Sequence, residues 1–244
     1  MSLLTCPGLT ACLSGRTPAA PGPDLAALTL VLVSEGEGAE GAVKFGEREV
    51  FEAHRSFLDA EAEARRLLVS GPFLPNPGGV SGLLVFDVED PLEVEQILAS
   101  APAVTAGLLK PTLFPLVTLA TLRDLPEIEQ RRVTASGGGG GDTRRYLVLM
   151  VEDGGAALEA IQHPSLAPTV LLLGQLGEPT PGGLFAVLDL ESARELSARL
   201  RVAGVAEAPE QGAWRTWEWF STPALEAFAF RASGPQPPSN SASK

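Results

Sequence analysis

The same order of strand and helix patterns occurs twice along the 244-residue chain, and this repetition limits the folds that the chain can adopt. In each half an apolar β-rich run precedes a helix pattern, two short apolar runs joined by a turn, a second helix pattern and a last strand pattern. The turns are Pro77-Gly78-Gly79 and Pro181-Gly182-Gly183. We therefore expect two copies of one β-α-β-β-α-β module, with a chance coincidence of strand patterns as the alternative.

In the first half, turn and capping residues mark the ends of the elements. Asp90 followed by Pro91 is typical of a helix start. Pro115 inside the last strand favours an edge position or a bulge, because proline has no N–H for a ladder. The elements predicted are a strand at 27–33, a helix at 47–66, an antiparallel hairpin of strands at 67–69 and 83–86, a helix ending near 101 and a strand at 112–119.

In the second half, the same reasoning predicts strands at 146–151, 170–173, 184–188 and 214–220 and helices at 156–161 and 191–200. The segment between the halves contains a polar stretch and the run Gly137 to Gly141, which we interpret as a flexible linker. The expected division is a disordered leader at 1–25, modules at 26–122 and 144–222, a linker at 123–143 and a disordered tail at 223–244.

The charge and the cysteines exclude some classes of function. Lys and Arg total 18 against 30 Asp and Glu, a formal net charge of -12, which argues against nucleic acid as a partner. The only cysteines are Cys6 and Cys12, so a reducing, cytoplasmic compartment is expected. No run approaches the roughly 20 apolar residues needed to span a bilayer, so no membrane association is expected. The stretch before Cys12 resembles a bacterial lipobox, which leaves a lipid anchor as the alternative.

The first half resembles the YCII-related family. His54 lies in the first helix, Gly71-Pro72 follows 17 residues later, and Gly82 opens the next strand. The resemblance implies an α+β fold of ferredoxin-like modules whose sheets pair into an α/β barrel, normally in a homodimer. Two modules in one chain would form this barrel intramolecularly, as a monomer with an internal pseudo-dimer, and the second copy resembles the family only by element order and turn.

The resemblance also implies a catalytic dyad of His54 and an Asp. The Asp position is occupied by Ala101, which has no ionisable group, so His54 is a candidate catalytic residue without its partner. Glu61 or Asp87 could supply a replacement carboxylate and raise the basicity of the imidazole. The other interpretation of His54 is a buried core histidine that bonds to a backbone carbonyl.

The second half lacks both dyad residues. Counting 17 residues back from Gly174 places Ala157 at the histidine position, and the Asp position falls near Ala198. His163 is followed by Pro164 and is expected in a loop or helix end. We therefore predict a degenerate second copy.

Other chemistries have little support in the sequence. Two histidines 109 residues apart offer no chelating spacing, and the glycine run lacks the Lys-Ser/Thr of a phosphate loop, so neither a metal nor a cofactor is expected. Trp214, Trp217 and Trp219 are expected to pack between the modules rather than line a ligand cleft.

Two functional hypotheses follow. The first is a degenerate tandem YCII-like protein that binds a small molecule, or serves a structural role, without turnover. The second is a small-molecule lyase- or dehalogenase-like enzyme in which His54 is the general acid/base, as the resemblance implies. The expected partner is a small-molecule ligand.

Overall fold

The computed structural model describes residues 24–40, 47–76, 78–137, 142–152, 154–178, 180, 182–204 and 214–228. The two cysteines, most of the glycine run and the tail beyond 228 lie outside the described residues.

The elements of the first half follow the predicted order. They are β1 (Leu25–Glu35), η1 (Glu37–Glu40), α1 (Glu47–Glu63), β2 (Leu67–Pro72), β3 (Val80–Phe86), α2 (Pro91–Ala99), α3 (Pro102–Thr105) and β4 (Leu109–Leu119). Asp90 is the N-cap of α2, because its carboxylate accepts a hydrogen bond from the Leu92 N–H.

The second half repeats this order after η2 (Ala120–Asp124) and α4 (Leu125–Ala135). Its elements are β5 (Arg144–Val151), α5 (Gly154–Gln162), η3 (Ala167–Thr169), β6 (Val170–Leu176), β7 (Leu184–Leu188), α6 (Ala193–Val202), β8 (Trp214–Ser221) and η4 (Pro223–Phe228).

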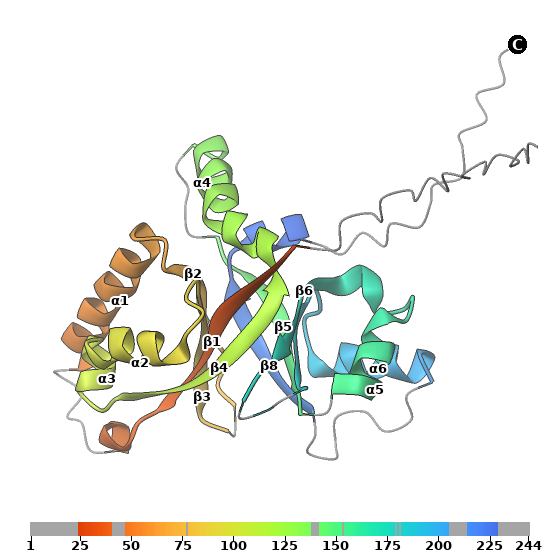
Figure 1. The fold of residues 1–244 in the computed structure, drawn as a ribbon, viewed down its shortest axis with the longest axis horizontal. Helices are drawn as coiled ribbons and strands as arrows, with labels where there is room; N and C mark the ends of the chain where they lie inside the picture. Colours follow the sequence, from red (N-terminus) through yellow and green to blue (C-terminus); the bar gives the residue numbers. More distant parts are fainter. Residues whose placement is uncertain are drawn as a thin grey trace, which may run out of the picture.

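All eight strands belong to one antiparallel sheet, in the order β2-β3-β1-β4-β6-β7-β5-β8. The strand order within each half is the same, and β4 joins the halves by pairing with β6. The outer strands β2 and β8 also approach each other, through a bridge between Phe73 and Trp219. The sheet is therefore a nearly closed barrel in a mixed α+β fold (Figure 1).

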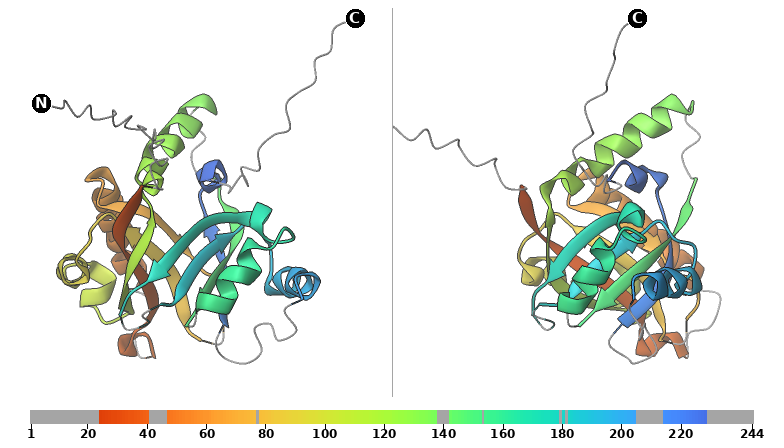
Figure 2. Two further views of the ribbon diagram at one scale, coloured as in Figure 1. Left: turned by 45° about the vertical axis from the view of Figure 1, so that its right-hand side comes forward. Right: turned by 90° about the vertical axis from the view of Figure 1, so that its right-hand side faces the viewer.

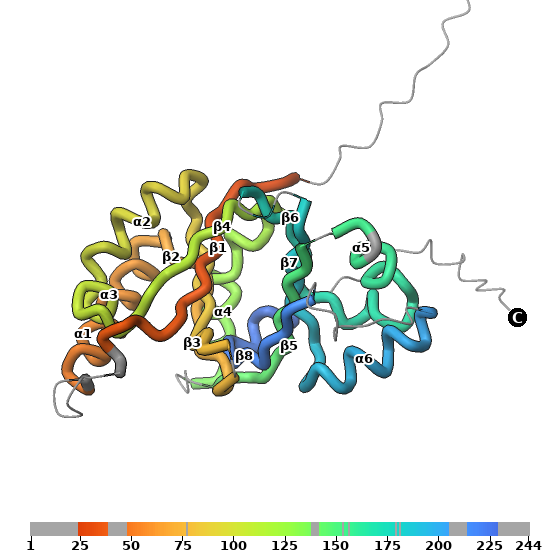
Figure 3. Tube along the Cα trace, turned by 90° about the horizontal axis from the view of Figure 1, so that it is seen from below, coloured from red at the N-terminus to blue at the C-terminus, as the bar shows by residue number. Residues whose placement is uncertain are grey.

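The core has three parts, one inside the barrel and two outside it. The interior is filled by alternate apolar side chains from all eight strands. On the outside, α1, α2 and α3 cover the first half, while α5 and α6 cover the second. Figure 2 and the view from below in Figure 3 show these two helix groups on opposite sides of the strands.

Equivalent backbone hydrogen bonds join the halves at both seams. At the β4–β6 seam, the Gly177 N–H donates to the Pro115 carbonyl over 2.9 Å. At the β2–β8 seam, the Leu74 N–H donates to the Glu218 carbonyl over 2.9 Å. The strand registers place these bonds at matching positions of the two halves. Each seam thus pairs the fourth strand of one half with the second strand of the other.

Each seam also has a glycine where the strands come closest. A Cβ atom at Gly71 would overlap the Phe220 carbonyl oxygen, and one at Gly174 would lie 3.1 Å from the Val117 carbonyl oxygen. These glycines occupy matching positions in β2 and β6. Only a residue without a side chain allows the backbones to approach in this way.

A hydroxyl group crosses each seam next to its glycine. Thr118 Oγ1 donates to the Leu173 carbonyl over 2.8 Å, and Ser221 Oγ donates to the Ser70 carbonyl over 3.5 Å. The two seams therefore share a strand pairing, a glycine and a hydroxyl contact.

Tryptophan packing between the halves is confirmed for two of the three residues. Trp217 and Trp219 are buried inside the barrel, and the Trp217 ring stacks on Phe73 of the first half with 5.6 Å between centroids. Trp214 instead packs against the outer cluster of the second half.

β4 is an inner strand without a bulge at Pro115, but Pro115 itself lies just outside the ladder with β6, so its setting is edge-like as expected. The carbonyl of Pro115 points towards β6, so its N does too. The missing N–H is tolerated because regular pairing with β6 covers only Leu116 to Thr118.

The sequence did not predict a helix in the segment expected as a linker. Residues 125–135 form α4, which lies at the end of the barrel where β1 begins (Figure 1). Leu122, Leu125 and Ile128 are three residues apart and pack on the barrel core. At the other end of the second half, η4 extends into the expected tail and buries Ala224 and Leu225.

We predict that Gly71→Ala destabilises the β2–β8 seam, because the added methyl group meets the Phe220 carbonyl. A loss of roughly 1–3 kcal/mol in the free energy of unfolding is expected from such overpacking. Gly78→Ala is the control, since the nearest atom to its Cβ would be Asn76 Oδ1 at 3.4 Å. Equal stability of the two variants in urea denaturation would contradict this account of the seam.

Candidate functional site

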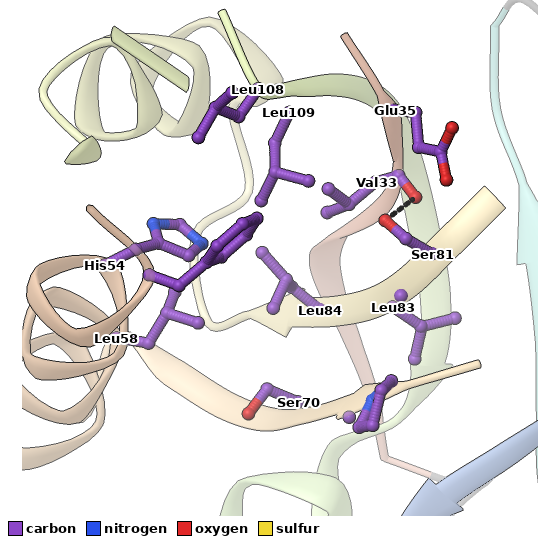
Figure 4. A pocket seen from close by; sticks show the side chains of 14 residues that line it. Val33, Glu35, His54, Leu58, Ser70, Ser81, Leu83, Leu84, Leu108 and Leu109 are labelled. Atoms are coloured by element: carbon purple, nitrogen blue, oxygen red, sulfur yellow. Dashed lines mark hydrogen bonds between the residues drawn. The ribbon is translucent and has the colours of Figure 1, made fainter. Parts of the chain in front are cut away.

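A cavity of about 540 Å³ lies between α1 and the outer face of the first-half sheet. Three α1 side chains form one wall, namely Phe51, His54 and Leu58. The sheet and the segment before β4 form the rest, largely from apolar side chains and glycine backbone. Figure 4 shows the labelled side chains around this space.

The helical period turns His54 towards the sheet. The inward positions of α1 are 54, 57, 58 and 61, spaced three and four residues apart. Two of these, His54 and Glu61, are polar and buried, with exposed fractions of 8% and 7%. The covered face of α1 therefore carries two groups that need hydrogen-bond partners.

Only one of these two groups has its partner. Glu61 accepts two hydrogen bonds from Arg66, over 2.6 and 2.9 Å. The Nδ1 atom of His54 is buried and has no hydrogen-bond partner among the described residues. The backbone carbonyl contact expected for a core histidine is thus not made by this nitrogen.

Burial decides the charge of the imidazole. Desolvation lowers the pKa of His54, because burial penalises the charged form. The ring stacks on Phe57, with 6.2 Å between centroids and an interplanar angle of 11°. A neutral imidazole can donate or accept one hydrogen bond at its free nitrogen, depending on its tautomer.

The predicted replacement carboxylates bind arginines and not His54. Glu61 pairs with Arg66, and Asp87 pairs with Arg123 over 2.7 Å. Ala101, at the family's Asp position, is fully buried at the start of α3. The helix α3 packs against α1, so this position does lie beside the helix that carries His54.

Several lining residues were missed by the sequence analysis. Glu35 ends β1 and brings a carboxylate to the side of the cavity opposite the His54 ring (Figure 4). Ser70 also lines the cavity, and Ser81 Oγ donates to the Val33 carbonyl over 3.0 Å. No motif marks Glu35, which follows the strand as one of several Glu residues in a turn-like stretch.

The second half has no equivalent of His54. Ala157 faces the sheet from α5 at the matching position and is fully buried, while Ala198 is exposed on α6. His163 follows α5, with Nδ1 2.8 Å from Ser165 Oγ and 3.2 Å from the Ser165 nitrogen. His163 does not line the cavity of the first half.

The described residues contain no group of three or more His, Cys, Asp or Glu side chains able to hold a metal ion. None of the described helices has the length and apolar content needed to cross a membrane.

Comparisons with known proteins agree with the first half and with the barrel. Residues 27–112 match the sequence model of the YCII-related domain, and no curated protein matches the chain. The structure is similar to a mutant of chlorite dismutase from Candidatus Nitrospira defluvii, with a TM-score of 0.50 and 13% identity over 86% of this chain and 97% of that chain. At this identity, the similarity concerns the fold alone. The chain thus contains a YCII-related domain at residues 27–112, within a barrel fold similar to that dismutase.

Proposed function

We propose that the chain is a tandem YCII-like protein that binds a small molecule at His54 without turnover. The two halves are ferredoxin-like modules that form a barrel within one chain, as a cytoplasmic monomer. The matching hydrogen bonds, glycines and hydroxyl contacts at the two seams support a duplication. Ala157 in place of a histidine makes the second copy the degenerate one.

The unpartnered Nδ1 atom of His54 carries the proposal of a ligand. A buried polar atom without a partner costs about 1–3 kcal/mol in the folded protein. A ligand that bonds to this nitrogen removes that cost and gains apolar contacts with Phe51 and Leu58. The volume of about 540 Å³ suits a small molecule.

The polarity of the cavity indicates the class of ligand. His54 is neutral at pH 7 because burial lowers its pKa, and Glu35 is the only other ionisable residue among the described residues that line the cavity. An anionic ligand would therefore meet a carboxylate and no cation. We expect an uncharged compound with an apolar body and one polar group, such as a phenol or a lactone.

The proposed absence of turnover rests on Ala101 and on the ion pairs that Glu61 and Asp87 make with arginines. Neither of these two carboxylates is bonded to the imidazole. The alternative is a lyase- or dehalogenase-like enzyme with His54 as general acid/base. It is favoured by Glu35, an exposed residue at the edge of the cavity that His54 lines. The activity named for the similar dismutase is not part of either proposal.

We predict that uncharged phenols and lactones raise the melting temperature of the wild type by several degrees and lose this effect in His54→Gln. Glutamine keeps a polar side chain but not the ring nitrogen. A thermal-shift screen measures the effect, and His163→Gln, which changes the histidine outside the cavity, is the control.

Three results of that screen separate the hypotheses. Ligands that stabilise the wild type and His163→Gln alone, and are recovered unchanged, support binding without turnover. Ligands that are converted, with a rate that depends on His54, favour the enzyme. Equal stabilisation of His54→Gln, or no hits together with a lower melting temperature of this variant, would contradict a ligand at His54.

The pH dependence of stability provides a separate prediction. Because burial lowers the pKa of folded His54, the unfolded chain takes up the proton first on acidification. The stability from this group is complete above the unfolded pKa of about 6.5 and is lost as the pH falls through the folded pKa. His54→Gln should thus lose less stability than the wild type between about pH 7 and pH 5.

Urea denaturation of the wild type and His54→Gln in parallel, at several pH values, measures this difference. If the free energy of unfolding changes with pH equally in His54→Gln and in the wild type, folding does not shift the pKa of His54.

A further inference from the structure

A second and larger groove, of about 790 Å³, lies along the β4–β6 seam. Both halves line this space, which we call the seam groove. Leu25, Val117 and Leu119 come from β1 and β4, and Leu158 and Leu173 come from α5 and β6. It is separate from the His54 cavity, because the two share no lining residue.

The seam groove exists because α5 is short. Helix α1 has 17 residues and α5 has 9, a difference of roughly 12 Å in length. Gly71 of β2 and Gly174 of β6 occupy matching positions in the two halves. When the same offset along the chain is applied to the helices, α5 corresponds to residues 51–59 of α1. The second half thus lacks about one turn at each end of this helix, and part of the outer face of β6 remains uncovered (Figure 2).

Two lining positions are apolar where the first half is polar. Leu158 stands on α5 where α1 has Arg55, and Leu173 stands in β6 where β2 has Ser70. Both leucines are half-buried. Both also pack against the outer apolar cluster of the second half, so the groove lining is continuous with that cluster.

Exposed apolar side chains collect at the mouth of the groove. Leu25, Val117 and Leu119 are 56%, 43% and 41% exposed, and Leu25 pairs directly with Leu119 across β1 and β4. A contiguous apolar patch beside a concave apolar surface is typical of a binding site.

The charges in the groove select the type of ligand. Asp124 is the only charged residue among the described residues that line it, and the chain has a net charge of -12. An anion therefore meets no cation there, and a cation meets one exposed carboxylate. The polar side chains Thr121 and Gln175 are exposed and can bond to a terminal polar group.

We propose that the seam groove is a second binding site, for an uncharged apolar small molecule with a flat or extended hydrocarbon body. Its volume lies within the range of about 300–1,000 Å³ typical of small-molecule sites. A ligand there contacts β4 of one half and β6 of the other, so it also stabilises the seam. This inference does not depend on the function proposed for His54.

The test uses two fluorescent probes that differ mainly by a sulfonate group. N-phenyl-1-naphthylamine is uncharged, whereas 8-anilino-1-naphthalenesulfonate is an anion. The uncharged probe is titrated into the full chain, the variants Leu158→Arg and Val117→Lys, and the control Val202→Arg. Val202 is 72% exposed on α6 and does not line the groove.

The uncharged probe should bind the wild type, Val202→Arg and His54→Gln with similar affinity, and bind better than the sulfonate probe. It should bind Leu158→Arg and Val117→Lys about tenfold more weakly, because an apolar ligand would desolvate the new charge. Circular dichroism and melting temperature establish that each variant is folded. Val117 is exposed, so Val117→Lys is expected to fold. This variant can therefore test the proposal even if Leu158→Arg does not fold.

Four results would overturn the proposal. They are no binding to the wild type, unchanged binding to both groove variants, an equal loss in Val202→Arg, and a loss in His54→Gln, which would place the probe in the other cavity. If the wild type binds no probe and sediments as a dimer that Val117→Lys dissociates, the groove belongs instead to a second copy of the chain.

Discussion

The structure depends on the close approach of the two halves of the sheet at the seams, which Gly71 and Gly174 permit. A barrel made of two four-stranded halves closes only if each half pairs its fourth strand with the second strand of the other. At the β4–β6 seam this pairing is regular over three residues, while the other seam is a bridge between Phe73 and Trp219. Pro72 stands where β6 has Gln175 and has no N–H to donate, which limits the ladder there.

The outer faces of the two halves of the barrel are covered by helices of different length. The long helix α1 covers the first half and brings His54 over the sheet, whereas the short helix α5 leaves the second half open beside the seam. The matching position in α5 is Ala157, which is fully buried. One half therefore holds a small cavity with an unpartnered nitrogen, and the other contributes to a larger apolar groove.

Much of the fold could be predicted from the sequence, because the strands and helices have clear apolar periods and Asp90 marks a helix start. Helix α4 could not, since only Leu122, Leu125 and Ile128 of a largely charged stretch touch the core. The spacing of His54 and Gly71 indicated residues that do line one cavity. Glu35 joins them only through the path of β1. The seam groove becomes visible only when the length of α5 is compared with that of α1.

The central claim is that His54 lines a cavity with a neutral ring whose buried Nδ1 atom has no hydrogen-bond partner among the described residues. Nuclear magnetic resonance of the imidazole ring, with the two histidines distinguished by His163→Gln, tests it most directly. The account predicts a neutral His54 at pH 7, with a pKa below the ordinary value of about 6.5 and an Nδ1 chemical shift that changes when a ligand binds. A pKa at or above the ordinary value, or a ring that no bound ligand perturbs, would contradict it.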